Sequence, residues 1–339
     1  MAGIRKGRQS FAFEKPPVIT AWASVAGKKE AQGPLGSCFD ITTEDNRFGQ
    51  PSWEQAEKTM QQLALSRLLE MEDLQKEQLG MVFSGDLLNQ CIGSSFSLRN
   101  TGIPHIGLYG ACSTMAEGLA LAAMAVGGGF RENAAAITSS HFAASERQYR
   151  FPLGYGGQRT PTSQWTVTGA GAALVAAAGE GIKIEGCTLG TVEDLCITDA
   201  ANMGAAMAPA AFSTIKKHFL DFGVSAMDYD WIVTGDLGQL GKDLLLELSS
   251  REGIPLGGKL QDCGCLIFDN LTQGVGSGGS GCGCSASVLC GYLLNQLQYG
   301  EVHRILFCGT GALLSPLSTQ QGLPIPSICH AVSIAGSPR

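Results

Sequence analysis

The chain carries the same pattern of strand, helix and strand twice. An apolar strand predicted at residues 81–86 ends in Gly85-Asp86-Leu87, and one predicted at residues 230–237 ends in Gly235-Asp236-Leu237. Short apolar runs that end in glycine and a polar residue are typical of buried parallel strands. This pattern restricts the chain to an α/β architecture before any other feature is considered.

The helices that follow these two strands also correspond. Each opens at a turn of small residues that contains a cysteine, Cys112 in the first half and Cys284 in the second, and a glycine closes each helix. Two such units in the same order indicate a duplicated α/β domain. We therefore predict an α/β chain of two pseudo-repeated halves, residues 1–180 and residues 181–339.

Three further elements follow from local patterns. Ser52 is a suitable cap for a long amphipathic helix. Residues 169–178 and 181–186 are predicted to be neighbouring strands joined by a tight glycine turn. Residues 265–268 are predicted to form a short strand.

Composition excludes several classes of protein. Charged residues make up 16% of the 339 residues and hydrophobic residues 44%, which describes a well-buried globular chain and not a disordered one. A net charge of −7 provides no footprint for nucleic acid. The twelve cysteines lie mostly in apolar runs, where a free thiol behaves as a small hydrophobe. We expect a soluble protein of cytoplasmic origin and a reducing compartment, without a signal peptide or a transmembrane segment.

Cys112 is the candidate nucleophile. It lies in Gly110-Ala111-Cys112-Ser113, directly before an apolar helix. The positive end of a helix dipole and its unpaired N–H groups favour a thiolate over a thiol. Acyl transfer by such a cysteine also needs a base and donors for an oxyanion.

Three motifs resemble those of the thiolase superfamily, and of ketoacyl synthase III in particular. Ala111-Cys112-Ser113 resembles the nucleophile motif, residues 168–173 resemble the family's Gly-x-Gly-Ala strand, and residues 309–313 resemble its C-terminal glycine-rich hairpin. The resemblance implies a thiolase-like, five-layered αβαβα fold. The helices that follow Cys112 and Cys284 would form its central pair.

The same resemblance implies that the catalytic partners are absent. The histidine position of ketoacyl synthase III falls at Gly235, its asparagine position falls at Cys282, and the histidine of a thiolase-type motif falls at Ser280. The chain is thus expected to be a pseudo-enzyme with Cys112 as a vestigial nucleophile. The alternative is an active acyl-CoA or acyl-carrier condensing enzyme or acyltransferase, in which His141 replaces the missing base. A further histidine, His218, follows two lysines and is expected at the surface.

Other motifs are similar to a thiolase-like family of stage V sporulation proteins from spore-forming bacteria. They are residues 7–11, residues 108–115 and the loop at residues 151–159. This resemblance implies a non-catalytic protein that binds dipicolinic acid, free or as its calcium chelate, and supports its uptake into the developing spore. Membrane proteins of the same operon would be its partners at the spore inner membrane, where the chain would be peripherally associated. The enzyme relatives imply a homodimer. The resemblance implies neither a cofactor nor a metal.

The residues between 147 and 179 permit such a ligand. Dipicolinate is a planar dianion, so its site needs donors for two carboxylates and a flat apolar surface. This stretch contains arginines and aromatic residues but neither Asp nor Glu. The candidate ligand-binding residues are Cys112, His141, Arg147, Arg150, Arg159, Trp165, Ser280 and Cys282. The stretch could instead be a cover loop or a dimer edge whose arginines pair with acids elsewhere.

Two other kinds of site remain open. Cys263-Gly264-Cys265 and Cys282-Gly283-Cys284 are spaced somewhat like a zinc ribbon, although one residue separates each pair where zinc ribbons have two. Residues 274–279 match the Gly-x-Gly-x-x-Gly pattern of dinucleotide sites, but this pattern alone is weak. We favour a flexible loop at the domain junction for the second motif.

Overall fold

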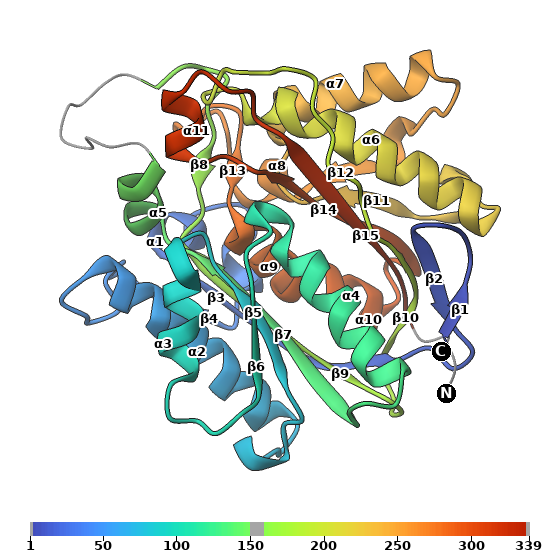
Figure 1. Ribbon diagram of the computed structural model, residues 1–339. Coiled ribbons are helices and arrows are strands. Elements are labelled where there is room, and N and C mark those ends of the chain that lie inside the picture. The colour runs from blue at the N-terminus through green and yellow to red at the C-terminus, as the bar shows by residue number, and fades with distance from the viewer. Residues whose placement is uncertain (1–2, 150–158, 337–339) are drawn as a thin grey trace.

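The computed structural model describes residues 3–149 and 159–336. Most of its strands form one mixed sheet of 13 strands, and the ten strands along its main path divide into two sets of five (Figure 1). The first set has the order β6 (His105–Leu108), β5 (Val82–Gly85), β7 (Asn133–Ser140), β9 (Gly169–Ala176) and β3 (Val18–Ala26). Strand β5 is parallel to both of its neighbours, and β9 is antiparallel to both of its own.

The second set repeats this arrangement. Its order is β12 (Leu260–Asp262), β11 (Trp231–Thr234), β14 (Arg304–Ala312), β15 (Ser327–Ala335) and β10 (Ile182–Thr188). Strand β11 is parallel to both neighbours and β15 is antiparallel to both. The pseudo-repeat read from the sequence is therefore confirmed in strand order and direction. The division at residue 180 stays a prediction.

The two sets meet where β3 pairs with β10 over a short register, Ile19 opposite Ile182 and Val18 opposite Lys183. Strand β3 thus lies between β9 and β10, so the predicted pairing of residues 169–178 with residues 181–186 is wrong. Gly179 and Gly181 adopt φ of +145° and +153°, which lets the chain pass over β3. The two strands, which are neighbours in sequence, therefore belong to different sets.

Short strands extend both sets. β4 (Ile41–Thr42) pairs with β3, and the hairpin of β1 (Gly3–Arg5) and β2 (Ser10–Phe13) pairs through β2 with β10. The N-terminal residues therefore complete the strand set of the second half. A separate two-stranded sheet joins β8 (Trp165–Thr166) to β13 (Gly279–Ser280).

Helices form three layers around the strands (Figure 1). Helices α2 (Trp53–Met71) and α3 (Ile92–Leu98) cover the outer face of the first set, and α6 (Met203–Phe222) and α7 (Gly238–Arg251) cover that of the second. Between the sets lie α4 (Thr114–Gly127), α9 (Cys282–Val288) and α10 (Leu294–Tyr299), with a π-helical turn at Leu289–Leu293 between the last two. The thiolase-like, five-layered fold is confirmed.

Apolar burial explains these layers, because each of the three large hydrophobic clusters fills one space between sheet and helices. The outer cluster of the first set joins Met60 and Leu68 of α2 to Leu174 of β9. The middle cluster joins Leu119 of α4 to Leu289 and to both sets of strands. The third cluster packs α6 against β11 and β14. Such burial is the main stabilising contribution to a layered domain.

Local signals determine where helices begin. The Ser52 side chain accepts a hydrogen bond from the Gln55 N–H, so the predicted cap of α2 is confirmed. Asp262 caps α8 (Cys263–Ile267) by accepting from the Cys265 N–H at 3.1 Å. The strand predicted at residues 265–268 is therefore wrong, because the Asp262 cap starts a helix there.

The remaining helices are short. They are α1 (Lys28–Ala31), α5 (Phe142–Tyr149) and α11 (Pro316–Gln320), with 3₁₀ turns at Gly36–Cys38, Lys76–Gln78, Asn89–Cys91, Ala111–Ser113, Ala226–Asp228 and Gly257–Lys259. Among the described residues, no helix combines the length and the apolarity needed to cross a bilayer.

The glycines of the Gly-x-Gly-Ala strand have a packing role. A Cβ built at Gly171 in β9 would lie 2.3 Å from the Ala286 carbonyl oxygen of α9, and one at Gly169 would lie 2.7 Å from the Ser287 Oγ. The central helix therefore approaches this strand more closely than any side chain permits.

Candidate functional site

Cys112 lies in the 3₁₀ turn Ala111–Ser113 that leads into α4. Ala111 adopts a left-handed φ of +52°, which is uncommon for alanine. The glycine-rich end of β14 packs on this turn, and a Cβ at Gly311 would lie 2.8 Å from the Gly110 carbonyl oxygen. The two motifs that resemble the thiolase family thus contact each other and determine where the thiol lies.

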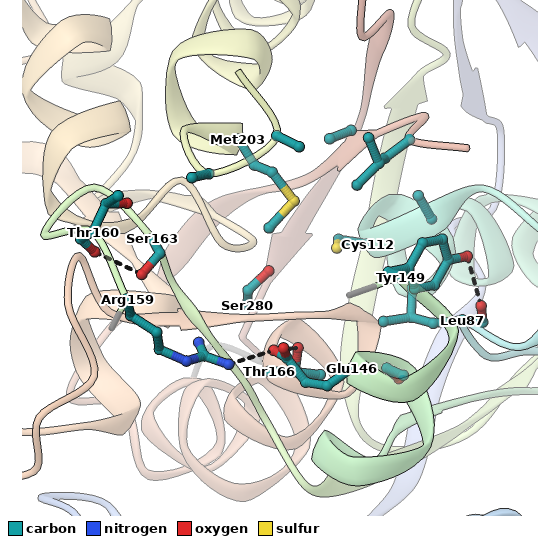
Figure 2. Close-up of a pocket in the computed structure, with 16 residues that line it drawn as sticks. Leu87, Cys112, Glu146, Tyr149, Arg159, Thr160, Ser163, Thr166, Met203 and Ser280 are labelled. Atoms are coloured by element: carbon teal, nitrogen blue, oxygen red, sulfur yellow. Dashed lines mark hydrogen bonds and ion pairs between the residues drawn. The ribbon is translucent and has the colours of Figure 1, made fainter. Parts of the chain in front are cut away.

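A cavity of about 380 Å³ opens above Cys112 (Figure 2). Strand ends, α5, the segment at residues 159–166 and the start of α6 surround it. Its lining residues are Leu87, Ala111, Cys112, Ser145, Glu146, Tyr149, Arg159, Thr160, Ser163, Thr166, Ala200, Ala201, Met203, Ser280, Ala312 and Leu314. Apolar walls with a few convergent polar groups are typical of small-molecule sites.

Arg159 is the cationic group of this cavity. Its guanidinium forms an ion pair with Glu146 at 2.8 Å and donates to the Gln164 carbonyl oxygen at 2.7 Å. It also lies over the Trp165 ring, 4.8 Å from the ring centroid. These contacts hold the guanidinium in one orientation, and a guanidinium has more N–H donors than they use.

Ser145 contributes a hydroxyl group to the same cavity. The side chain is 2% exposed, and its Oγ has no hydrogen-bond partner among the residues that the structure describes. A buried hydroxyl without a partner is costly, so a ligand that hydrogen-bonds to it is favoured.

Burial, and not the helix start, dominates the electrostatics of Cys112. Burial raises the pKa of the Cys112 thiol well above its ordinary value, and the neighbouring carboxylate of Asp236 raises that pKa further. Burial therefore outweighs the effect of the helix start that was expected to favour a thiolate. Burial also raises the pKa of Asp236, to about 6.

The three positions expected for catalytic partners hold no base. Gly235 has no side chain and packs against Thr310, whose backbone N would lie 3.1 Å from an added Cβ. Cys282 is buried and donates its thiol hydrogen to the Ser139 carbonyl oxygen at 3.0 Å. Ser280 donates to Asp236 at 3.1 Å.

His141 lies outside the cavity lining. Its Nε2 is 2.8 Å from the Asn46 carbonyl oxygen, and its Nδ1 accepts from the Ala143 N–H at 3.2 Å. The ring packs on Trp53, and burial lowers the pKa of the imidazole. Both ring nitrogens are therefore used by the backbone, and neither is available to take a proton from Cys112.

The structure brings together three of the eight candidate residues, Cys112, Arg159 and Ser280. Cys282 packs behind Cys112 in a small cluster with Leu87, and Trp165 supports Arg159. Arg147 points away and forms an ion pair with Glu54. Arg150 and the loop at residues 151–158 lie outside the described residues.

Three residues of the site carried no sequence signal that pointed to a ligand. Glu146 and Ser145 come from α5, and Met203 begins α6. Asp236 did carry one, because it is the aspartate of the repeated Gly-Asp-Leu strand end. The repeat by itself indicates duplication and does not indicate a role in the site.

The structure of the described residues supports neither the zinc site nor the dinucleotide site. No group of three His, Cys, Asp or Glu side chains within residues 3–149 and 159–336 is placed to hold a metal ion, and all twelve cysteines are free. The glycine-rich residues 274–279 follow the helix α8 and not a strand. A dinucleotide motif requires a strand at that point.

The family model of stage V sporulation protein AD matches residues 7–335. The chain belongs to the stage V sporulation protein AD family. A curated member of this family, stage V sporulation protein AD of Bacillus subtilis (strain 168), is 44% identical over 326 residues, which are 96% of each chain. The resemblance to a family of sporulation proteins is thus confirmed over nearly the whole sequence.

Solved structures confirm the fold of this family member. A variant of OleA from Xanthomonas campestris aligns with a TM-score of 0.62 and 15% identity, over 96% of this chain and 99% of the other. 3-Oxoacyl-(acyl carrier protein) synthase III from Xanthomonas oryzae pv. oryzae aligns with a TM-score of 0.59 and 15% identity over the same shares. 3-Oxoacyl-[acyl-carrier-protein] synthase III from Aquifex aeolicus VF5 aligns with a TM-score of 0.54 and 12% identity, over 94% of this chain and 99% of the other.

Proposed function

We propose that this family member acts in sporulation by binding dipicolinic acid, free or as its calcium chelate, and by supporting its uptake into the developing spore. The observation that carries the proposal is one cavity that holds both the Arg159 guanidinium and the unpartnered Ser145 hydroxyl. A planar dicarboxylate needs donors at its two ends and an apolar surface along its ring.

The cavity matches these needs in size and in polarity. Its volume of about 380 Å³ lies in the range typical of small-ligand sites. The hydroxyl-bearing residues Thr160, Ser163 and Thr166 line the cavity on the side of Arg159 and Glu146, whereas Leu87 and Met203 are apolar parts of its wall (Figure 2). Leu314 adds to the apolar lining. One ligand carboxylate would bind near Arg159 and share it with Glu146. The other would accept from Ser145.

The proposal further includes a non-catalytic role for Cys112, because none of the three positions expected for its catalytic partners holds a histidine or an asparagine. The thiol would then form part of the floor of an inherited acyl-thioester site. Partners at the spore inner membrane would be the membrane proteins of the same operon, and the chain would associate with that membrane peripherally through them.

Calorimetric titration with dipicolinate, with and without calcium, tests this function. We expect saturable binding, and Arg159→Gln should weaken it by at least about tenfold because a charged hydrogen bond contributes about 1.5–3 kcal/mol. The matched control is Arg251→Gln, which removes an exposed arginine of α7 that is paired with Glu247. This control should bind as the wild type does.

Two results would count against the proposal. The first is an absence of binding at millimolar dipicolinate in both conditions. The second is a stoichiometric acyl adduct after incubation with acyl-CoA, detected by intact-mass spectrometry and lost in Cys112→Ser. That adduct would establish the acyltransferase alternative.

We also propose that the chain forms a homodimer along β6. This strand ends the sheet, and Ile106 on it and Tyr109 directly after it are exposed. An open edge with exposed apolar side chains favours pairing with a second strand. Light scattering should therefore give twice the chain mass of 35.4 kDa, and a monomeric mass at micromolar concentration would contradict the dimer.

A further inference from the structure

The hairpin of β1 and β2 concentrates positive charge in a chain of net charge −7. Arg5, Lys6 and Arg8 lie at the end of β1 and in the turn that follows, and all three are exposed. Residues 3–13 contain no Asp or Glu. None of the three basic side chains forms an ion pair with a residue that the structure describes. Their charges are therefore available to an external anion.

An apolar side chain lies beside these charges. Ile4 of β1 is 39% exposed and pairs directly opposite Ala12 of β2. Because side chains alternate along a strand, Ala12 and Ser10 face the same side of the hairpin. The Ser10 hydroxyl donates to the carboxylate of Asp221, at the end of α6, at 2.7 Å. Ile4 therefore lies on the side of the hairpin that faces the end of α6.

The C-terminal end of α6 continues this surface, and Figure 1 shows it next to the hairpin. A Cβ added at Gly7 in the hairpin turn would overlap the Asp221 side chain, so the turn and the helix end are in contact. Leu220, the residue before Asp221, is 70% exposed. Asp221 pairs with Lys217 at 2.9 Å, so its charge does not cancel that of the hairpin.

We propose that Ile4, Arg5, Lys6, Arg8 and Leu220 form a hairpin surface that binds a membrane of anionic lipids directly. The three basic side chains would bind headgroup phosphates, and the two apolar side chains would enter the boundary of the acyl chains. Basic and exposed apolar residues side by side are typical of proteins that lie on a membrane surface. This inference goes beyond the proposed function, in which membrane proteins hold the chain at the membrane.

A lipid surface fits this region better than a nucleic acid does. The phosphate backbone of a nucleic acid offers anions but no apolar layer for Ile4 and Leu220. The chain has 30 acidic and 23 basic residues, so an extended polyanion that followed the molecule beyond the hairpin would be repelled. A flat layer of headgroups can contact the hairpin surface alone.

The hairpin surface lies far from the cavity. Met203, at the start of α6, lines the cavity, and Leu220 is near the end of the same helix. At about 1.5 Å per helical residue, the two positions are about 25 Å apart along the axis. Substitutions in the hairpin surface should therefore leave binding in the cavity unchanged.

The test is sedimentation of the full-length chain with vesicles at low salt. One set contains equal parts of phosphatidylglycerol and phosphatidylcholine, and the other contains phosphatidylcholine alone. We expect binding to the first set only. Arg5→Gln, Lys6→Gln and Arg8→Gln combined should weaken it at least tenfold, because each basic residue near an anionic surface contributes a factor of about five. Ile4→Ser with Leu220→Ser should weaken it at least threefold, through lost apolar burial.

The matched control combines Arg67→Gln, Lys76→Gln and Arg251→Gln. These side chains are exposed and lie outside the hairpin surface, each next to a glutamate. The control changes the net charge by the same amount as the hairpin variant, and it should bind vesicles within twofold of the wild type. All of the substituted polar side chains are exposed, so each variant should unfold at the wild-type temperature in circular dichroism.

Several results would overturn the proposal. They are equal sedimentation with both sets of vesicles, equal losses in the hairpin variant and the control, and wild-type binding that added salt does not weaken. Binding of a DNA duplex as tightly as of the anionic vesicles would also overturn it, because the hairpin would then be a general site for anions.

The inference and the proposed function fail separately. A chain that binds anionic vesicles but no dipicolinate would refute the proposed function alone. A chain that binds dipicolinate but sediments with neither set of vesicles would refute the hairpin surface alone.

Discussion

Gly171→Ala will destabilise the protein by about 3 kcal/mol or more. The added Cβ would lie 2.3 Å from the oxygen and 2.6 Å from the carbonyl carbon of Ala286, both in the backbone of α9. Neither atom belongs to a flexible side chain, so β9 and the central helix must move apart. Overpacking of a core costs about 1–3 kcal/mol and more where the backbone shifts.

Thermal unfolding followed by circular dichroism measures this effect. A melting temperature lower by at least about 4 °C, or loss of soluble protein, is expected for a chain of this size. The control is Gly107→Ala in β6, where the nearest atom to the new Cβ is 3.7 Å away. If Gly171→Ala melts at the same temperature as the wild type, α9 lies farther from β9 than the structure places it.

Glu30→Gln will stabilise the protein at pH 8 by about 2–3 kcal/mol and leave its stability at pH 4.5 nearly unchanged. Glu30 in α1 is 1% exposed, and its Oε1 accepts from the Thr168 N–H at 2.9 Å. Its Oε2 has no hydrogen-bond partner in the described part of the chain. Burial raises the pKa of this carboxyl to about 7.

The sign follows from proton binding. Between the unfolded pKa of 4.5 and the folded pKa of about 7, the folded state binds more protons than the unfolded state. Stability therefore falls as the pH rises through this window and stays lower above it. Glutamine is the neutral isostere of the protonated acid, keeps the acceptor for Thr168 and avoids the charge.

Urea denaturation at pH 4.5, 6 and 8 provides the measurement, with the exposed Glu180→Gln as control. The stability difference between Glu30→Gln and the wild type should grow with pH, and the control should show none. A destabilised Glu30→Gln at pH 8 would mean that the nearby Lys29 ammonium compensates a charged Glu30.

Elements whose pattern is local could be predicted from the sequence. Ser52, the cysteine turns and the repeated strand ends depend on neighbours within a few residues, and the structure has them where expected. The order of β9, β3 and β10 could not be read in this way, because strand pairing between distant segments is set by the packing of the whole sheet. The duplicated topology came from the resemblance and from the repeat together.

Burial of single polar residues was the least predictable property. His218 was expected at the surface because lysines precede it, yet it is fully buried and bonds to Thr188 and the Tyr229 hydroxyl. Helix α6 directs the His218 side chain inward and the side chains of the two preceding lysines outward. Arg147 and Arg159 also differ in their surroundings, since Arg147 pairs with Glu54 and Arg159 lines the cavity.

The position of β2 has a consequence for any attempt to divide this protein. Because β2 pairs with β10, a chain cut near residue 180 leaves the second fragment without a strand that the intact molecule uses. The first fragment would in turn carry residues 3–13 with no sheet to join. A split version in which two fragments reassemble would therefore need residues 3–13 transferred to the second fragment, through a new linker to residue 181.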